Sequence, residues 1–281
     1  MIKPIHLIMG LGLSLMLISC NVGQVTDEQI VRKYFRHAKV IYNDQGRVTV
    51  IKCPKETSNL IDTYLFQPKP CQINGPLPAE IGQLTELQYL ALHHASITEI
   101  SPEIGQLTNL VSLSLSSNSL TTLPPEIDQL ANLQKLNLAR NRLTTLPPEI
   151  GALTTLEVLD VSENDLATIP PEIGRMTKLE ELNIELNNLV ALPAEIGQLA
   201  NLTSLYLGKN NIVTMPPETG QLTRLKMLSL SSNPPLTTLP PEIGQLTNLE
   251  QLDLYNTSIT SLPPEILELK DTEIVPKYLV K

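Results

Sequence analysis

The hydrophobic positions of the chain repeat with a fixed period over most of its length. Beginning at Leu87, the pattern L-x-x-L-x-L-x-x-N-x-L-x-x-L-P-x-E-I-x-x-L-x-x recurs every 23 residues. Later copies start at Leu110, Leu133, Leu156, Leu179, Leu202, Leu225 and Leu249, and the last interval is 24 because Asn233-Pro234-Pro235-Leu236 holds one extra residue. Eight units therefore run from Leu87 to Asp271. A period of this length predicts a repeat architecture in which neighbouring units bury one continuous core.

Each unit predicts a short strand followed by a compact helical turn. In Leu136-Asn137-Leu138, apolar and polar residues alternate, as in a strand with one buried face. The Pro-Pro-Glu that follows suits the first turn of a helix, and the glycine two residues after the glutamate keeps that helical or 3₁₀ turn short. Narrow parallel strands on one side and wider turns on the other predict a curved solenoid with a concave sheet and a convex back.

A recurrent asparagine follows each strand. Its amide can bond backbone groups of adjacent coils, so we expect a ladder that satisfies buried polar groups. Ala95 in the first unit and Thr257 in the last replace the asparagine, as expected of terminal repeats. The asparagines are Asn118, Asn141, Asn164, Asn187, Asn210 and Asn233.

The repeated stretch L-P-P-E-I-G-Q-L resembles the leucine-rich repeat family, in its typical 23-residue, Ras-suppressor-like class. The resemblance covers about two-thirds of the chain. It implies an α/β solenoid of a kind used for recognition, so we expect a protein that binds a partner and is not an enzyme.

The ends of the repeat array predict caps. Residues 73–84 form the back half of one more unit, which lacks a front. Before it, Thr26 to Lys39 predicts an amphipathic helix, and Asn43-Asp44-Gln45-Gly46 between two β-prone runs predicts a hairpin. We expect four regions: a signal at 1–19, a linker and cap at 20–72, repeats at 73–271 and a C-terminal cap at 272–281. A separate functional N-terminal domain is the alternative for the second region.

The first nineteen residues predict export. Lys3 is their only charged residue, and an apolar run from Leu7 to Ile18, too short to span a bilayer, follows it. The sequence Leu17-Ile18-Ser19-Cys20 resembles the lipobox of bacterial lipoproteins, which implies that Cys20 carries acyl chains. An ordinary secretory signal is the alternative. Since Asn21 is not the aspartate linked to inner-membrane retention, we favour a lipid anchor in the outer membrane or at the cell surface.

Two cysteines, Cys53 and Cys71, follow the expected cleavage point. Disulfides persist in exported proteins, so this pair predicts a bridge, with free buried thiols as the alternative. Such a bridge stabilises by roughly 3 kcal/mol in the chain-entropy model.

Composition and charge narrow the function. The formal net charge of −9 argues against a nucleic-acid partner, which requires clustered Lys and Arg. We find neither a phosphate-binding glycine-rich loop nor a nucleophile elbow, and we expect no cofactor. His93 and His94 follow one another in a predicted strand, so we expect their rings on opposite faces and no metal clamp.

The candidate binding residues are those whose side chains point away from the leucine core on the concave sheet. Three of the seven tyrosines lie there, and exposed tyrosine is a favoured interface anchor. Acidic residues also cluster, with Glu157, Glu163 and Glu180 at the sheet edges, which favours a basic partner. A solvated acidic face and a calcium site are the alternatives. The predicted partner-binding residues are Tyr89, His93, Asp160, Glu181, Asn183, Glu185, Tyr206, Asp253 and Tyr255.

We therefore expect a protein-binding lipoprotein of the bacterial envelope, whose concave face recognises a protein or a glycan. The alternative is a structural spacer of the envelope without a specific concave ligand.

Overall fold

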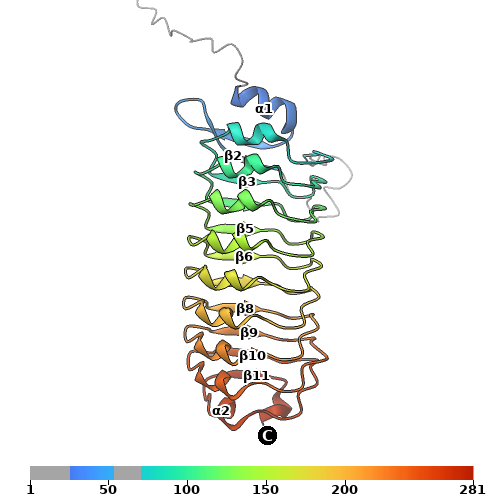
Figure 1. Ribbon diagram of the computed structural model, residues 1–281, viewed down its shortest axis with the longest axis vertical. Coiled ribbons are helices and arrows are strands. Elements are labelled where there is room, and N and C mark those ends of the chain that lie inside the picture. The colour runs from blue at the N-terminus through green and yellow to red at the C-terminus, as the bar shows by residue number, and fades with distance from the viewer. Residues whose placement is uncertain (1–25, 54–70, 281) are drawn as a thin grey trace, which may run out of the picture.

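The computed structural model describes residues 26–53 and 71–280 as one stack of coils. Within these residues, an eleven-stranded sheet runs in sequence order from β1 to β11, and a 3₁₀ turn follows most strands on the opposite side of the stack (Figure 1). The predicted leucine-rich repeat solenoid is confirmed. The proposed signal and Cys20 lie outside the described residues. No helix in the described ranges is long and apolar enough to cross a membrane.

The strands are short and almost all parallel. β1 pairs with β2 antiparallel, and every later neighbouring pair is parallel. The strands are β1 (Lys39–Tyr42), β2 (Val48–Lys52), β3 (Tyr89–Ala91), β4 (Ser112–Ser114), β5 (Lys135–Asn137), β6 (Val158–Asp160), β7 (Glu181–Asn183), β8 (Ser204–Tyr206), β9 (Met227–Ser229), β10 (Gln251–Asp253) and β11 (Glu273–Val275).

The convex side consists mainly of five-residue 3₁₀ turns, each starting at the proline or alanine before a glutamate. They are η2 (Ala79–Gln83), η3 (Pro102–Gln106), η4 (Pro125–Gln129), η5 (Pro148–Ala152), η6 (Pro171–Arg175), η7 (Ala194–Gln198), η8 (Pro217–Gln221) and η9 (Pro241–Gln245). A Cβ atom on Gly151 would lie 2.3 Å from the Glu172 carbonyl oxygen of the next coil. The glycine therefore permits the close approach of successive coils, in addition to keeping the turn short.

The core is a column of aliphatic side chains. Neighbouring strands align residues 23 apart, so that Leu136 lies beside Leu159 and Leu159 beside Leu182. These leucines are at most 1% exposed. Burial of each coil's leucines thus depends on the coils on either side, as expected for a solenoid.

The predicted asparagine ladder is confirmed. Asn164 is buried, and its Nδ2 donates to the carbonyl oxygens of Val161 in its own coil and Leu138 in the preceding coil, both at 3.0 Å. Its Oδ1 accepts from the Leu143 N–H at 2.9 Å. The other asparagines of the set repeat this pattern, whereas Thr257 bonds the Leu254 carbonyl of its own coil. Each amide thereby joins two coils.

The N-terminal helix caps the stack, as predicted, but it is shorter than expected. α1 (Asp27–Tyr34) begins with a capping box between Thr26 and Gln29 and ends five residues before the predicted Lys39. Phe35 leaves the helical conformation with its ring buried, and the chain must then reverse to enter β1. The Asp27 carboxylate joins the helix to the sheet, because it accepts from the Val48 N–H at 2.8 Å and from Arg47 Nε at 3.1 Å.

The predicted hairpin is present, and its second strand has a further role. β2 pairs in parallel with β3, with Ile51 beside Leu90, so β2 is the strand that the incomplete first unit lacked in the sequence pattern. A disulfide between Cys53 and Cys71 joins the end of this strand to the rest of the coil, as predicted, with a Cα–Cα distance of 5.6 Å. Residues 54–70 between the cysteines lie outside the described residues.

The last coil is closed by α2 (Pro264–Leu267), by β11 and by η10 (Lys277–Val280). Ile274 and Leu279 are each 5% exposed, so both side chains pack against the end of the core.

We expect Asn164→Ala to lower the free energy of unfolding by about 3 kcal/mol, because the substitution leaves buried backbone groups of two coils without partners. Asn188→Ala, at an exposed asparagine of the next coil, should change it by less than about 0.5 kcal/mol. Urea denaturation measures both. Equal effects of the two substitutions would contradict a structural role for the ladder.

The contact between α1 and η2 makes stability depend on pH. Glu80 accepts from the Tyr34 hydroxyl at 2.7 Å and from Lys33 Nζ at 3.0 Å. Hydrogen bonds from Tyr34, from its own backbone and from Lys33 lower the pKa of Glu80 to about 2. A carboxyl whose pKa is lowered by folding stabilises the protein above its unfolded pKa, and this contribution is lost as the pH falls through the folded value.

We therefore expect the free energy of unfolding to fall less steeply between pH 4.5 and pH 2 in Glu80→Gln than in the parent protein. Denaturant titrations at several pH values measure the slopes. Glu99→Gln, at an exposed glutamate of the next coil, is the control and should keep the parent slope. A parent-like slope in Glu80→Gln would rule out this contact as the source.

Candidate partner-binding face

The concave face presents three side chains from each coil. Two lie in the strand and the third lies just beyond its C-terminal end. The structure places Tyr89 and Glu181 at the first position, Asp160, Asn183, Tyr206 and Asp253 at the second, and His93, Glu185 and Tyr255 at the third.

Strand register brings five of the second-position residues into one continuous row. Asp160 pairs with Asn183, Asn183 with Tyr206, and Tyr206 with Ser229, which pairs in turn with Asp253. Tyr89 lies several coils away in β3, where Lys52 Nζ lies over its ring, 5.9 Å from the centroid. Four of the nine predicted residues therefore lie in this row, and Glu181, Glu185 and Tyr255 lie beside it on the same face. Tyr89 and His93 lie apart from it.

Several polar side chains of this row stabilise the turn that follows their strand. Asp160 Oδ1 accepts from the Ser162 N–H at 3.1 Å and from its hydroxyl at 2.7 Å. Asn183 accepts from the Glu185 N–H, and Asp253 from the Tyr255 N–H, each two residues further on. Side chains of Asp and Asn commonly stabilise turns in this way. The carboxylates of Asp160 and Asp253 are thus held in position by their own coils.

Glu185 reaches across a neighbouring coil. Its Oε1 accepts from the Ser229 hydroxyl, two coils away, at 3.5 Å. A Cβ atom at Gly208, in the coil between them, would lie 2.9 Å from this oxygen. The glycine therefore leaves room for the carboxylate. Glu181 is exposed, with its side chain on the same face.

The acidic cluster is smaller than the sequence suggested. Glu163 forms an ion pair with Arg140, with 2.8 Å between Oε1 and Nε, so its charge is offset. Asp160, Glu181 and Glu185 remain, with Glu157 and Glu180 beside them. Among the described residues, no three His, Cys, Asp or Glu side chains are grouped to hold a metal ion, so the calcium alternative finds no support.

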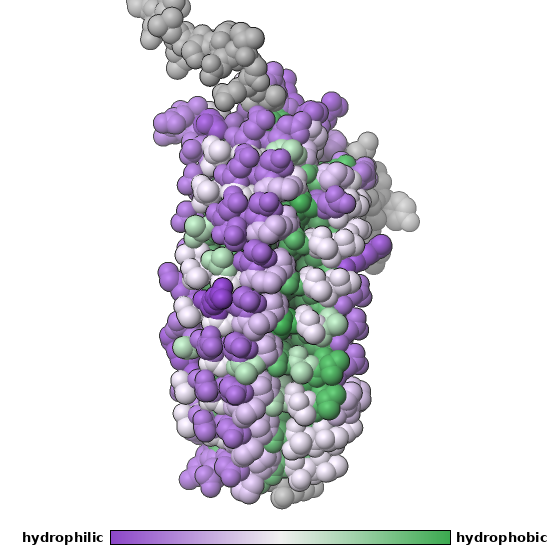
Figure 2. Space-filling view, in the orientation of Figure 1, coloured by the Kyte–Doolittle hydropathy of each residue, from purple (hydrophilic) through white to green (hydrophobic). Residues whose placement is uncertain are grey.

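The exposed aromatic surface of the face lies mainly at its two ends. Tyr255 is 64% exposed and Tyr89 is 40% exposed, whereas Tyr206 is half-buried in the central row. Figure 2 shows the opposite, convex side, where a narrow apolar stripe runs along the stack between more polar surfaces.

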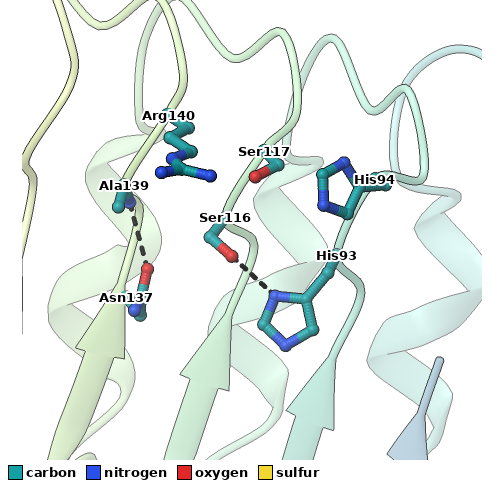
Figure 3. Close-up of a pocket in the computed structure, with 7 residues that line it drawn as sticks. All are labelled: His93, His94, Ser116, Ser117, Asn137, Ala139 and Arg140. Carbon is teal, nitrogen blue, oxygen red and sulfur yellow. Dashed lines mark hydrogen bonds between the residues drawn. The ribbon is translucent and has the colours of Figure 1, made fainter. Parts of the chain in front are cut away.

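The prediction that His93 and His94 point to opposite faces is wrong. β3 ends at Ala91, and His94 has a left-handed backbone, with φ of 53°. This turn directs both imidazoles to one side, where they line a pocket of about 290 Å³ (Figure 3). Ser116 and Ser117, with Ala139 and Arg140, repeat the arrangement in the next two coils, and Asn137 completes the lining.

This pocket was not predicted from the sequence, because the left-handed turn leaves a weak sequence signal. The residue after the third concave position has a positive φ in all eight full units, yet glycine occupies none of these positions. The residues are His94, Ser117, Arg140, Glu163, Leu186, Lys209, Ser232 and Asn256.

Family comparisons agree with this geometry. Three models match successive stretches: a leucine-rich repeat region at residues 71–189, a leucine rich repeat at 177–234, and two further leucine rich repeats at 223–268. The chain belongs to the leucine-rich repeat family. Such proteins generally mediate protein binding and are typically interaction scaffolds without enzymatic activity. Comparison with curated protein sequences finds no match.

Solved leucine-rich repeat structures are similar over much of the chain. A Leptospira interrogans leucine-rich repeat protein is 40% identical, with 71% of this chain and 62% of that chain covered and a TM-score of 0.49. The ectodomain of the Arabidopsis thaliana receptor kinase GASSHO1/SCHENGEN3, in complex with CASPARIAN STRIP INTEGRITY FACTOR 2, is 29% identical, with coverage of 84% and 31% and a TM-score of 0.70. The Arabidopsis receptor kinase HAESA, in complex with the peptide hormone IDA and the co-receptor SERK1, is also 29% identical, with coverage of 83% and 38% and a TM-score of 0.67. This leucine-rich repeat chain thus spans less than two-thirds of the length of each.

Proposed function

We propose that this chain is a non-enzymatic leucine-rich repeat lipoprotein of the bacterial envelope that recognises a partner protein through its concave face. The observation that carries the proposal is the row from Asp160 through Asn183 to Tyr206, flanked by Glu181 and Glu185. The row combines an aromatic anchor with polar groups whose positions are fixed before a partner arrives, and such preorganisation lowers the entropic cost of binding. The two plant receptor structures, which were determined in complex with partners, support this use of a similar solenoid.

Charge favours a basic partner. Glu181 and Glu185 lie on the same strand and turn as Asn183, and Glu157 and Glu180 add negative charge at the sheet edge. In a chain with a formal net charge of −9, this surface attracts cations and accelerates encounter with a basic protein. We therefore favour a basic protein over a glycan.

The proposed location rests on the sequence. The lipobox-like Leu17-Ile18-Ser19-Cys20 places an acyl anchor at Cys20, and the Cys53–Cys71 disulfide is in keeping with an oxidising, extracytoplasmic compartment. A position at the cell surface would expose the concave face to extracellular proteins.

We expect the double variant Glu181→Lys, Glu185→Lys to capture much less of the partner. The two lysines remove the attraction to a basic partner surface and repel it. A pull-down from envelope and host-type extracellular proteins, quantified by mass spectrometry, should show a loss of about tenfold or more. The control is Glu265→Lys, Glu268→Lys, which makes the same charge change at exposed residues in and just after α2. Equal capture by all three proteins would place the partner away from Glu181 and Glu185, for example on the convex side, and capture by none would favour the structural spacer.

The anchor has its own test. We expect radiolabelled palmitate to enter the parent protein in bacterial cells, and Cys20→Ala to abolish both the label and membrane attachment. Cys20→Ala that still sediments with membranes would contradict a lipid anchor.

A further inference from the structure

The pocket at the C-terminal ends of β3, β4 and β5 has a chemistry that differs from the acidic row beside it. Its lining comes from three consecutive coils and includes Arg140, His94 and Ser117. The guanidinium of Arg140 and the ring of His94 lie on either side of Ser117 (Figure 3). Among the residues that the structure describes, no carboxylate lines the pocket.

Arg140 lines the pocket with its guanidinium beside Ser117 (Figure 3). Its Nε donates to Glu163 Oε1 at 2.8 Å, and this hydrogen bond raises the pKa of the guanidinium. The side chain is still 62% exposed, and within the described residues neither Nη nitrogen donates to another protein group. Two parallel N–H donors therefore remain for a ligand, in the geometry that matches the two oxygens of a carboxylate.

The other polar groups fit the same ligand. The Ser117 hydroxyl and the His94 imidazole both offer donors, and Ser116 is fixed by a 2.6 Å hydrogen bond with His93 Nδ1. Asn137 shields the pocket from the acidic row, since its Nδ2 donates to Asp160 at 3.3 Å while its Oδ1 accepts from the Ala139 N–H. The pocket thus presents donors, while the neighbouring row presents acceptors.

The dimensions limit the ligand to a small group. A volume of about 290 Å³ admits the end of one side chain but excludes a folded surface. Since the proposed partner is a protein, the anion it offers most directly is an aspartate or glutamate side chain.

We propose that this pocket binds an acidic side chain of the partner, held by the Arg140 guanidinium with Ser117 and His94. The inference rests on the proposed function and deepens it. The partner would be basic where it meets Glu181 and Glu185, and would carry an acidic anchor two to four coils nearer the N-terminus. This charge reversal fixes the direction in which the partner lies along the solenoid.

The test uses small probes, so it does not depend on identifying the partner. The full chain is titrated with the blocked peptide Ac-Gly-Glu-Gly-NH2, with Ac-Gly-Gln-Gly-NH2 and with sodium sulfate, and histidine side-chain NMR signals are followed. We expect saturable shifts of the His93 and His94 signals with the glutamate peptide only. Arg140→Gln should weaken this binding by about tenfold or more, as expected for loss of a charged donor.

Two controls separate the pocket from general electrostatics. Arg142→Gln removes an exposed arginine of the same coil that does not line the pocket, and should change the affinity by less than about twofold. Ala139→Leu keeps every charge and fills the pocket, and should abolish the shifts.

Three results would overturn the proposal: no saturable shift, equal binding of the glutamine peptide, or binding of sulfate as tight as that of the glutamate peptide. The last would assign the pocket to sulfate-type anions. The Glu181→Lys, Glu185→Lys variant could lose partner capture and still bind the peptide. That result would support the pocket as a binding site separate from the acidic row. Peptide binding without any captured partner would refute the proposed function alone.

Discussion

Contact between successive coils is the constraint on which the rest of this molecule depends. A three-residue strand and a five-residue turn cannot bury their own leucines, so each coil depends on its neighbours for a core. The asparagine ladder makes this stacking specific. An amide such as that of Asn164 bonds the backbone of two coils at once, so a shift of one coil against the next would leave buried donors and acceptors unpaired. The convex glycines act together with the ladder, because their missing Cβ atoms allow the coils to approach.

This regular scaffold leaves the concave side chains free to vary. Their backbone positions are set by the leucines and asparagines, so a change at Glu181 or Tyr206 alters the surface without altering the coil. The left-handed residue after each strand extends this surface beyond the sheet. By turning His94, Ser117 and Arg140 toward the same side as their preceding residues, it adds a pocket with donors beside a row with acceptors. One face therefore carries two opposite recognition chemistries a few coils apart.

The fold was predictable from the sequence because its causes are local and repeated. A 23-residue period specifies which side chains are buried, and the period-two alternation within Leu136-Asn137-Leu138 places Asn137 on the concave side. The hairpin and the disulfide were also predictable, since turn residues and cysteine pairs leave clear signals. β2 was not recognised as the strand of the first coil, because residues 54–70 separate it from the pattern to which it belongs.

The binding chemistry was less predictable, because it depends on side-chain conformation and long-range pairing. Glu163 forms an ion pair with Arg140, which lies 23 residues earlier in the chain and in the adjacent coil. The orientation of His94 follows from a positive φ at a residue that is not glycine, so the alternation that holds within the strand fails just beyond it. The stretch of Glu185 toward Ser229 requires the absence of a side chain at Gly208 in the coil between them.

The central claim is that the concave face, and not the convex back, meets the partner. Photo-crosslinking on intact cells tests it most directly, with a photoreactive amino acid introduced at Tyr206 in β8 or at the exposed Gln198 in η7. We expect a discrete cross-linked species from position 206 and none from position 198. The same species from position 198 alone would place the partner on the convex side and contradict binding through the concave face.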